Sequence, residues 1–379
     1  MVAMEKNNKT LNVPNLRFPE FSGEWEKELL GTTCKVLMCK RILAYQTNSD
    51  CGVPFYKIGT IGGVPDAYIS KELFESYRAK YNYPRKGEVM ITCAGTVGKA
   101  MIFDGHDSYY QDSNIVWIDN PTNTIDNTFL YHFISKVDWS KLNTTTIVRI
   151  YNDDLRQLWI SYPTLSEQRK ISIFLNLLNQ RIETQKKIID KYESLITGLY
   201  QLLFQNAKYN DFVSLGDISQ ISNGNSDVKD ASMNNDGNLY PFFDRSDEIK
   251  FLPEYLFDKE AIIYPGEGAE FYPRYYNGKF ALHQRCYAIY DISTDFIPRY
   301  LYHYCKTQNS YFVRNAVGST VASLRLDTFK RLKIPAIPTD YQESLVMFLD
   351  KIEAKIECNR TILKKYEEQK KYLLSTLFI

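Results

Sequence analysis

The sequence lacks paired cysteines and clustered histidines. Its seven cysteines are scattered with no Cys-x-x-Cys pair, and its four histidines show no metal-ligand spacing. This pattern argues against a disulfide framework and a structural zinc site, and we expect reduced, buried thiols. The chain also has no apolar run near twenty residues, and its polar start lacks the hydrophobic segment of a signal peptide. We expect a cytoplasmic protein without a membrane span, with a disordered tail at residues 1–15.

Catalytic motifs are missing as well. The run TCAGTVGKA at residues 92–100 ends in Gly-Lys, but Cys93 stands where a phosphate loop needs glycine, and Ala100 has no hydroxyl for magnesium. No GxSxG, no HExxH and no Asn/Asp-Pro-Pro-aromatic methyltransferase motif occurs. No pair of carboxylates stands out for acid–base work. We therefore predict no catalytic residue, no metal ligand and no cofactor bound by this chain.

The chain is not a polycation, because its 46 basic and 45 acidic residues leave a net charge of +1. Binding to nucleic acid would therefore require basic side chains gathered on one face. Tyrosine is abundant, at 29 residues. Its side chain fills a groove and also hydrogen-bonds.

What the sequence does contain is a long internal repeat. The stretch at residues 168–204 returns without a gap at 342–378, 174 residues later. Identical positions include the Lys-Tyr-Glu at 191–193 and 365–367 and the Leu-Phe at 203–204 and 377–378. A repeat of this length exceeds a solenoid period. It indicates two copies of a unit made of a domain and a helix.

Each repeated block predicts a long coiled-coil helix. Apolar residues recur at alternating spacings of four and three, and neither block contains proline. A polar residue occupies the same seam position in each copy, where it can set the register of the helix pair. At 1.5 Å per residue each helix is about 55 Å long. The predicted seam consists of Ile171, Leu175, Leu178, Ile182, Gln185, Ile189, Leu345, Leu349, Ile352, Ile356, Asn359 and Leu363.

Between the helices, short β-rich runs alternate with Gly, Pro and Asn turns, as at residues 88–92, 114–118 and 286–290. The fold class is therefore α+β. We predict two globular α/β domains separated by two long antiparallel coiled-coil helices, with a pseudo-two-fold internal repeat. The expected boundaries are 16–162 and 208–336 for the domains, and 163–207 and 337–379 for the helices.

The loops of both domains carry groups suited to a DNA groove. Asn and Gln pair with adenine, Arg and Lys with guanine, and Ser and Thr contact phosphates. In the first domain the candidate DNA-binding residues are Lys99, Tyr109, Tyr110, Gln111, Ser113, Asn114, Thr144, Thr145, Arg149 and Asn152. In the second they are Arg245, Arg274, Tyr275, His283, Gln284, Arg285, Arg314, Ser319, Thr320 and Arg325.

These residues together resemble the specificity subunit of a type I restriction–modification system. The opening LRFPEFSGEW at residues 16–25 resembles the usual start of such subunits. Pro163 followed by EQRKI at 167–171 is similar to the start of their central helical region, and CAGTVGK at 93–99 to a glycine turn of their target-recognition domains. The second copy departs with YQE at 341–343.

The resemblance implies that each domain reads one half of a bipartite site in double-stranded DNA. It also implies that the helices set the unread spacer and that two methylation subunits dock on the chain, bringing S-adenosylmethionine. Restriction subunits, with ATP and magnesium, would complete the nuclease. Two alternatives stay open from the residues alone: the recognition end of a fused restriction–methylation enzyme, and a coiled-coil adaptor that binds only protein.

Overall fold

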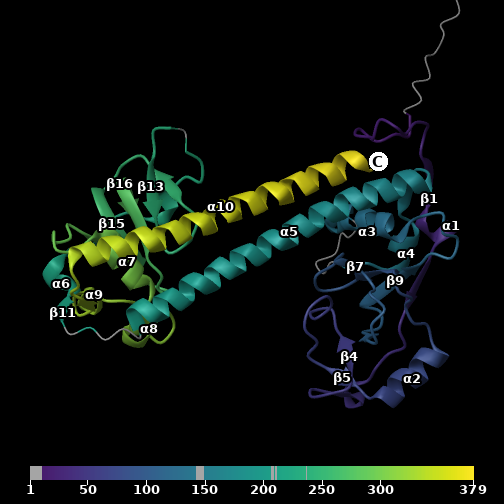
Figure 1. Cartoon of the computed structure of the whole chain (residues 1–379), viewed down its shortest axis with the longest axis horizontal. Helices are drawn as coiled ribbons and strands as arrows, with labels where there is room; N and C mark the ends of the chain where they lie inside the picture. Colours follow the sequence, from purple (N-terminus) through teal and green to yellow (C-terminus); the bar gives the residue numbers. More distant parts are fainter. Residues whose placement is uncertain (1–10, 142–148, 206–208, 210, 236) are drawn as a thin grey trace, which may run out of the picture. The chain divides into compact units, whose positions relative to one another are not determined.

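The computed structural model describes residues 11–141, 149–205, 209, 211–235 and 237–379. Most of the tail expected at residues 1–15 thus lies outside the described residues. The chain divides into a first unit, residues 1–185 with 362–379, and a second unit, residues 186–361. Each unit combines one globular domain with part of both long helices, α5 and α10 (Figure 1).

The domain of the first unit is built on two four-stranded sheets and one strand pair. In spatial order the sheets are β2-β9-β6-β7 and β3-β5-β4-β8, and the pair is β1-β10. The strands are β1 (Glu26–Leu29), β2 (Lys35–Met38), β3 (Thr47–Asn48), β4 (Val53–Tyr56), β5 (Tyr68–Ile69), β6 (Val89–Thr92), β7 (Ala100–Ile102), β8 (Tyr109–Tyr110), β9 (Ile115–Asp119) and β10 (Trp159–Tyr162). The helices are α1 (Leu30–Thr33), α2 (Lys71–Lys80), α3 (Asn127–Lys136) and α4 (Asn152–Arg156), with short 3-10 turns η1 (Ala44–Gln46) and η2 (Trp139–Lys141).

The domain of the second unit has one six-stranded sheet, in the order β12-β17-β15-β16-β13-β14, and the pair β11-β18. Its strands are β11 (Phe212–Ser214), β12 (Gln220–Asn223), β13 (Tyr240–Phe243), β14 (Lys250–Leu252), β15 (Phe257–Pro265), β16 (Arg274–Leu282), β17 (Cys286–Tyr290) and β18 (Lys333–Pro335). Its helices are α6 (Leu215–Ile218), α7 (Pro298–Lys306), α8 (Asn309–Asn315) and α9 (Leu326–Lys330), with a 3-10 turn η4 (Val228–Asp230).

The two domains share the pairing of several matching strands. The first and last strands of each pair antiparallel, as β1 with β10 and β11 with β18. Each domain also pairs two of its strands in parallel, β4 with β8 in the first and β13 with β16 in the second. Pro54 and Pro241 stand at the same place in the matching strands β4 and β13. The internal repeat therefore extends from the helices into the domains.

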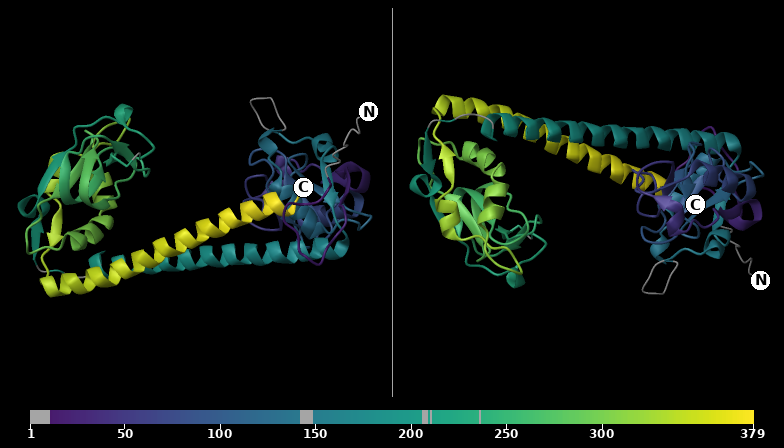
Figure 2. Two further views of the ribbon diagram at one scale, coloured as in Figure 1. Left: turned by 90° about the horizontal axis from the view of Figure 1, so that it is seen from above. Right: turned by 90° about the horizontal axis from the view of Figure 1, so that it is seen from below.

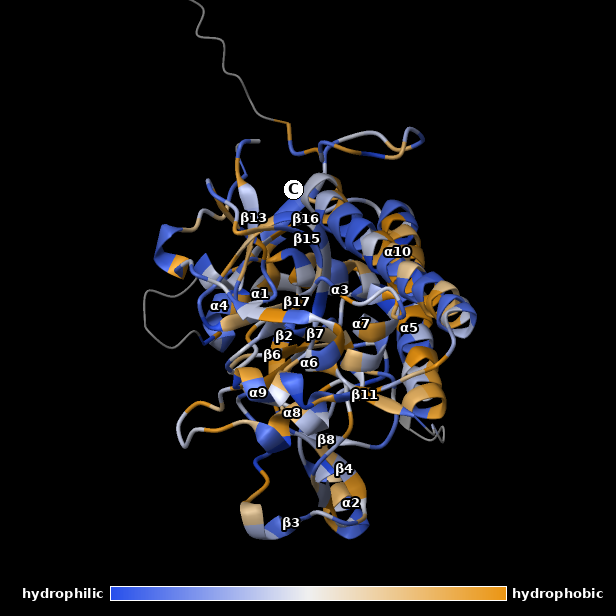
Figure 3. Ribbon diagram, turned by 90° about the vertical axis from the view of Figure 1, so that its left-hand side faces the viewer, coloured by the Kyte–Doolittle hydropathy of each residue, from blue (hydrophilic) through white to orange (hydrophobic). Residues whose placement is uncertain are grey.

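Both long helices form where the heptad pattern predicts them. Helix α5 spans Leu165–Tyr200 and continues into a π-helical turn, η3 (Gln201–Gln205), while α10 spans Thr339–Leu377. Hydrophobic and hydrophilic residues alternate around both helices (Figure 3). Most of the apolar seam positions are buried, including Ile171, Leu175, Leu178, Ile182, Ile189, Leu345, Leu349, Ile352 and Ile356. Gln185 is 8% exposed, and Asn359 and Leu363 are half-buried.

The helices are antiparallel, as predicted. In the first unit the start of α5 shares a core with the end of α10, a core that includes Leu175, Leu377 and Phe378. In both views of Figure 2 the end of α10 lies at the first domain. In the second unit the end of α5 shares a core with the start of α10, through Ile196 and Leu349. There Arg360 of α10 also pairs with Glu193 of α5 at 2.5 Å.

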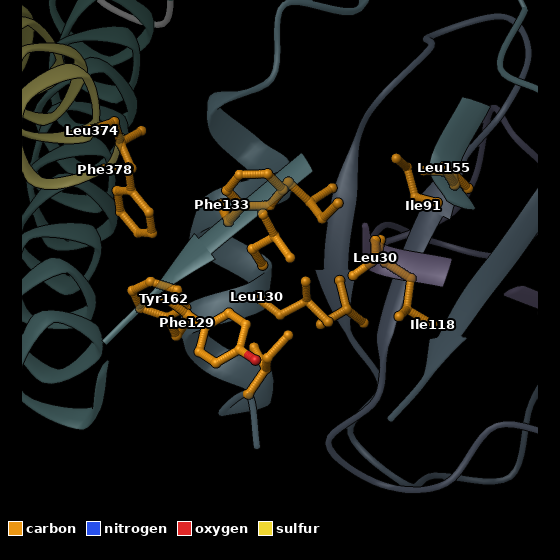
Figure 4. Close-up of a cluster of buried hydrophobic side chains, with 14 of the residues drawn as sticks. Leu30, Ile91, Ile118, Phe129, Leu130, Phe133, Leu155, Tyr162, Leu374 and Phe378 are labelled. Carbon is orange, nitrogen blue, oxygen red and sulfur yellow. The ribbon is translucent and has the colours of Figure 1, made fainter. Parts of the chain in front are cut away.

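The core of the first domain joins its sheet to both helices. Leu30, Ile91 and Ile118 lie on the sheet side, and Phe129 of α3 stacks near Phe378 with ring centroids 4.8 Å apart (Figure 4). Helix α3 begins at this place because the Asp126 side chain accepts hydrogen bonds from the backbone N–H of Thr128 and Phe129. The helix pair is thus held to the domain by a continuous hydrophobic core.

A buried glutamine ties each long helix to its domain. Gln168 accepts from Asp126 N at 2.7 Å and donates to the backbone oxygens of Thr124 and Pro163, at 3.0 and 2.8 Å. In the second unit, Gln342 accepts from Ile297 N at 2.8 Å and donates to the oxygens of Asp295 and Ile337, both at 2.9 Å. Both glutamines are fully buried. Each one therefore sets where its helix leaves the domain.

We expect Gln342→Ala to lower the free energy of unfolding of the second unit by about 1–3 kcal/mol. The substitution leaves a buried N–H and two carbonyl groups without their partner. Urea unfolding followed by circular dichroism measures the loss. Gln180→Ala, at an exposed site on α5, is the control and should change stability little. Equal losses in the two variants would contradict a role for the buried contacts.

Candidate nucleic-acid interface

In the first unit, loops from four strands meet at one edge of the sheets. The end of β2 and the end of β6 both pair with the start of β9, as Met38 with Val116 and Thr92 with Ile115. The loops after β2 and β6 therefore adjoin the β8–β9 loop at residues 111–114. The loop after β4 joins them, because Gln111 N donates to Tyr56 O at 2.9 Å.

Several predicted DNA-binding residues of the first unit lie at this edge. Lys99 Nζ donates to Ile61 O at 2.6 Å, and Ile58 N donates to Gln111 Oε1 at 3.4 Å. Arg149 Nη2 donates to Ser113 O at 3.3 Å, which brings the segment before α4 to the same place. The remaining members at the edge or beside it are Asn114, whose backbone oxygen accepts from Cys93 N at 2.7 Å, and Asn152 at the start of α4. Thr144 and Thr145 lie outside the described residues.

Tyr109 and Tyr110 have to be removed from the candidate surface. Their side chains are 0% and 2% exposed, in the core between β4, α2 and the sheet. The sequence prediction placed them in a polar loop, but parallel pairing with Phe55 and Tyr56 turns them into strand β8. The Tyr110 hydroxyl is satisfied internally by Ser108 Oγ at 2.9 Å. A side chain buried in this way does not reach a DNA base.

In the second unit the matching loops enclose a cleft of about 640 Å³. The turn after β15 and the loop before β17 adjoin because Pro265 pairs with Cys286. The loop after β12 reaches the same place, since Gln284 N donates to Ser226 O at 3.1 Å. Four predicted residues line the cleft, namely Arg245, His283, Gln284 and Arg285. Of these, Arg245, Gln284 and Arg285 are exposed.

Charged side chains are among the residues that line this cleft. Lys250 pairs with the buried Asp244. Burial raises the pKa of Asp244, but hydrogen bonds from Lys250 and Ser246 outweigh burial and hold it below its ordinary value. Asp244 therefore stays ionised at neutral pH, and it fixes the loop after β13 that carries Arg245.

Arg274 and Tyr275 are structural in this fold. The Arg274 guanidinium is partly buried, lies 5.1 Å from the Phe243 ring centroid, and donates to Ser246 O at 2.7 Å and to Asp244 O. Tyr275 packs against Tyr302 of α7 and Arg299, on the helix side of the domain. The sequence prediction placed both in a surface loop, but they belong to β16. They do not join the cleft residues.

The loop at residues 316–325 lies beside the turn after β15. Leu324 N donates to Gly266 O at 2.8 Å, and Gly268 N donates to Ala322 O at 3.0 Å. Ser319, Thr320 and Arg325 of this loop are exposed. Arg314 lies on α8, where its Nε donates to Ser310 O at 3.1 Å. The loop residues lie beside the cleft. Arg314 lies near the end of α8, directly before this loop in the chain.

Sequence reasoning missed the carboxylates that hold these loops. Arg41 pairs with Asp112 at 2.8 Å, and Arg285 pairs with Glu267 at 2.8 Å. The partners of the first pair are 71 residues apart in the chain. A Cβ on Gly266 would lie 2.0 Å from Arg285 O, so only glycine lets the turn approach this closely. Without the fold, no local pattern connects these residues.

One group of side chains among the described residues has the composition of a metal site: His303, Asp350 and Glu353. Two cations already neutralise the carboxylates, because Lys306 pairs with Glu353 at 2.6 Å and Arg299 pairs with Asp350. The Tyr200 hydroxyl of α5 donates to Glu353 Oε1 at 3.2 Å and lies 2.9 Å from His303 Nδ1. The group is therefore a charged network that binds α7 to both long helices, and it does not favour a divalent cation.

The network predicts a pH-dependent stability for the second unit. Burial raises the pKa of Glu353, but the charge and hydrogen bond of Lys306 outweigh burial and hold it below its ordinary value. The stabilisation by ionised Glu353 is thus complete above the ordinary glutamate pKa of about 4.3 and is lost as pH falls through the lower folded value. We expect Glu353→Gln to cost about 1–3 kcal/mol at pH 7, with a smaller difference from the native chain in acid.

Urea unfolding at several pH values measures this difference. Glu357→Gln is the matched control on the same helix, because the Glu357 side chain is 75% exposed. A cost for Glu353→Gln that stays constant down to pH 3 would contradict the ion-pair explanation.

Comparisons with known proteins agree with the arrangement of two similar domains and two long helices. The model of the type I restriction modification DNA specificity domain matches the chain twice, at residues 22–194 and 208–368. A candidate type I restriction enzyme specificity subunit of Haemophilus influenzae is 48% identical over 170 residues, which cover 45% of this chain and 40% of that protein. The matched region is thus less than half of that relative's length.

Solved structures show the same fold. The crystal structure of the S subunit of a type I restriction–modification system from M. genitalium has a TM-score of 0.67 at 15% identity, covering 97% of this chain and 99% of that one. A chain from a structural study of complex assembly and conformational transition of the type I system has a TM-score of 0.53 at 15% identity, covering 93% and 97%. No helix within the described residues is long and apolar enough to span a membrane. With two domains, two long helices and both domain matches, the chain belongs to the family of type I restriction–modification DNA specificity subunits.

Proposed function

We propose that this chain is the DNA-reading subunit of a type I restriction–modification complex. Each domain reads one half of a bipartite site in double-stranded DNA. The observation that carries the proposal is the duplicated loop edge, which presents Arg41, Gln111 and Asn114 in the first unit and Arg245, Gln284 and Arg285 in the second. These side chains match the donor and acceptor patterns of base edges in the major groove.

The two long helices connect the reading domains, and we assign to them the unread spacer between the half-sites. A helix pair with a long, mostly apolar seam resists bending, so its length limits which separations of the half-sites can be bound together. Gln185 and Asn359 stand at the polar positions of the seam, and the register role predicted for them belongs to this proposal.

Exposed apolar residues on both helices supply docking surfaces for partner subunits. On α5, Ile173 is 61% exposed and Phe174 38%; on α10, Met347 is 58% exposed and Phe348 48%. The two pairs lie 174 residues apart, at matching places in the repeat. In the first unit a groove of about 700 Å³ adjoins Phe174 and is lined also by Leu177 and Tyr366. Two matching surfaces suit two copies of one partner, which we assign as the methylation subunit.

In this proposal the chain itself is not catalytic. The methylation subunits bring S-adenosylmethionine, and restriction subunits bring ATP and magnesium. The role of this chain is to choose the sequence on which its partners act. Its side chains therefore contribute binding free energy and geometry to the complex.

The test is to express the chain with a methylation subunit of a type I system from the same organism and to map the methylated positions of the host genome. We expect a single bipartite motif with a fixed spacer, and sequence-dependent DNA retention in gel shift that requires this chain. Methylation by this chain alone would favour the fused-enzyme alternative. A complex that forms but never retains DNA by sequence would favour the protein adaptor.

We expect Phe174→Asp and Phe348→Asp each to remove one methylation subunit, because a charge in an apolar contact carries a large desolvation cost. Mass measurement of the purified complex should then find one methylation subunit per chain in either single variant and none in the double variant. Lys187→Asp, at an exposed position of α5, is the control and should keep two. Two retained subunits in the double variant would place the docking surface elsewhere.

A further inference from the structure

Each loop edge carries an arginine that a carboxylate from another loop holds in place. In the first unit, Arg41 follows β2 and its Nε donates to Asp112 Oδ2 of the β8–β9 loop at 2.8 Å. In the second unit, Arg285 precedes β17 and its Nη1 donates to both oxygens of Glu267, at 2.8 and 2.9 Å. The arginine side chains are 65% and 62% exposed, and their carboxylates only 18% and 21%.

These contacts leave part of each guanidinium for a ligand. Arg41 uses Nε, so its two Nη groups form an open fork, while Arg285 uses Nη1, so its Nε and Nη2 lie together on the open side. Two parallel N–H groups match the O6 and N7 acceptors of guanine. Because the carboxylate already orients the fork, less side-chain freedom is lost when the base is bound.

The carboxylates also argue against a phosphate contact. An arginine beside Asp or Glu forms a pair of zero net charge, which loses most of the electrostatic attraction to the DNA backbone. The directional hydrogen bonds of the open fork remain. A guanine edge is neutral and needs directional donors, so it is the ligand that such a pair favours.

We propose that Arg41 and Arg285 each read the guanine of one G·C pair in the major groove, one in each half-site. Asp112 and Glu267 are positioning residues that aim the two forks. This inference rests on the proposed function. It adds that each half-site contains a G·C pair on which recognition depends.

The experiment measures methylation by the complete complex on duplexes in which each base pair of the mapped site is changed in turn. With the native chain, replacing one G·C pair in each half should lower the methylation rate about tenfold to a hundredfold. Arg285→Ala should abolish this preference at one position of one half-site. Arg41→Ala should do so at one position of the other. Asp112→Asn and Glu267→Gln should weaken the preference at the same two positions severalfold, and leave the others unchanged.

Arg85→Ala is the matched control. Arg85 is 67% exposed and is held by Glu88 and Asp119, but it lies at the opposite edge of the sheet, where β6 begins and β9 ends. This variant should keep all preferences. A half-site without a G·C pair would overturn the inference, as would arginine variants that slow methylation of every duplex equally. A native complex with no bipartite motif would instead overturn the proposed function itself.

Discussion

Exchanging residues 16–162 for the corresponding domain of a related subunit will replace one half of the methylated DNA motif and leave the other half unchanged. The exchange is structurally self-contained because β1 and β10 pair with each other, so both ends of the transplanted segment stay together. The loops proposed to read DNA in the first unit, including the segment before α4, all lie within the exchanged range. The second domain keeps its own loops, cleft and strand pair.

Methylation mapping of the hybrid measures this result. Gln168 lies in α5, outside the exchanged segment, and contacts the backbone of Thr124 and Asp126 inside it. The donor subunit should therefore also have a glutamine at this position, so that its domain fits the Gln168 that the hybrid keeps. The reverse exchange of residues 208–336 should change only the other half and serves as the complementary control. Hybrids in which both halves change would show that the domains do not read independently.

Inserting four residues into both long helices will lengthen the spacer by one base pair. The insertion sites are after Gln185 in α5 and after Thr361 in α10, where the chain passes between its two units, so neither unit is disturbed. Both helices need the insertion because both cross this boundary. Four residues change the heptad register in a way that coiled coils accommodate by local unwinding.

The size of the change follows from two periodicities. Four helical residues advance about 6 Å and turn by about 400°, which leaves a net rotation of about 40°. One base pair advances about 3.4 Å and turns by about 34°. The rotation thus matches one base pair, while the length alone would allow almost two. We expect the original motif to lose at least tenfold in methylation rate and a motif longer by one pair to appear.

A helix-forming insert such as Ala-Glu-Ala-Lys should produce the new spacer, whereas Gly-Ser-Gly-Ser at the same sites should give no defined motif, because a flexible insert transmits neither length nor rotation. Methylation mapping of both variants distinguishes these results. An unchanged motif with full activity in the helical variant would show that another part of the complex sets the spacer.

The periodic parts of this fold were predictable from the sequence, and the pairings between distant segments were not. The heptad positions from Ile171 to Ile189 follow from local spacing, because each helix buries one stripe of its own residues. Tyr109 and Tyr110 follow no such rule. Their burial depends on a parallel pairing with β4, more than fifty residues earlier in the chain.

The same contrast holds for the candidate site. His283, Gln284 and Arg285 were predicted together because they are adjacent in the chain and bounded by strands. Arg41 was missed because its partner Asp112 comes from another loop, and Arg274 was misplaced because Asp244 and Phe243 fold over it. Composition predicts which groups suit a base edge, but only the fold shows which of them are already in use.

The repeated seam has a consequence for how such a chain arises. In the first unit Leu373 and Leu377 of α10 share a buried core with Leu175 of α5, and the residues at the matching places of α5 are Leu199 and Leu203. A polypeptide holding only one domain and α5 therefore carries a seam that a second copy of itself can fill. We expect it to form a homodimer with two identical domains which, under the proposed function, would read a palindrome. The present chain is what gene duplication and fusion of such a protomer would produce, with the loops of each half then free to diverge.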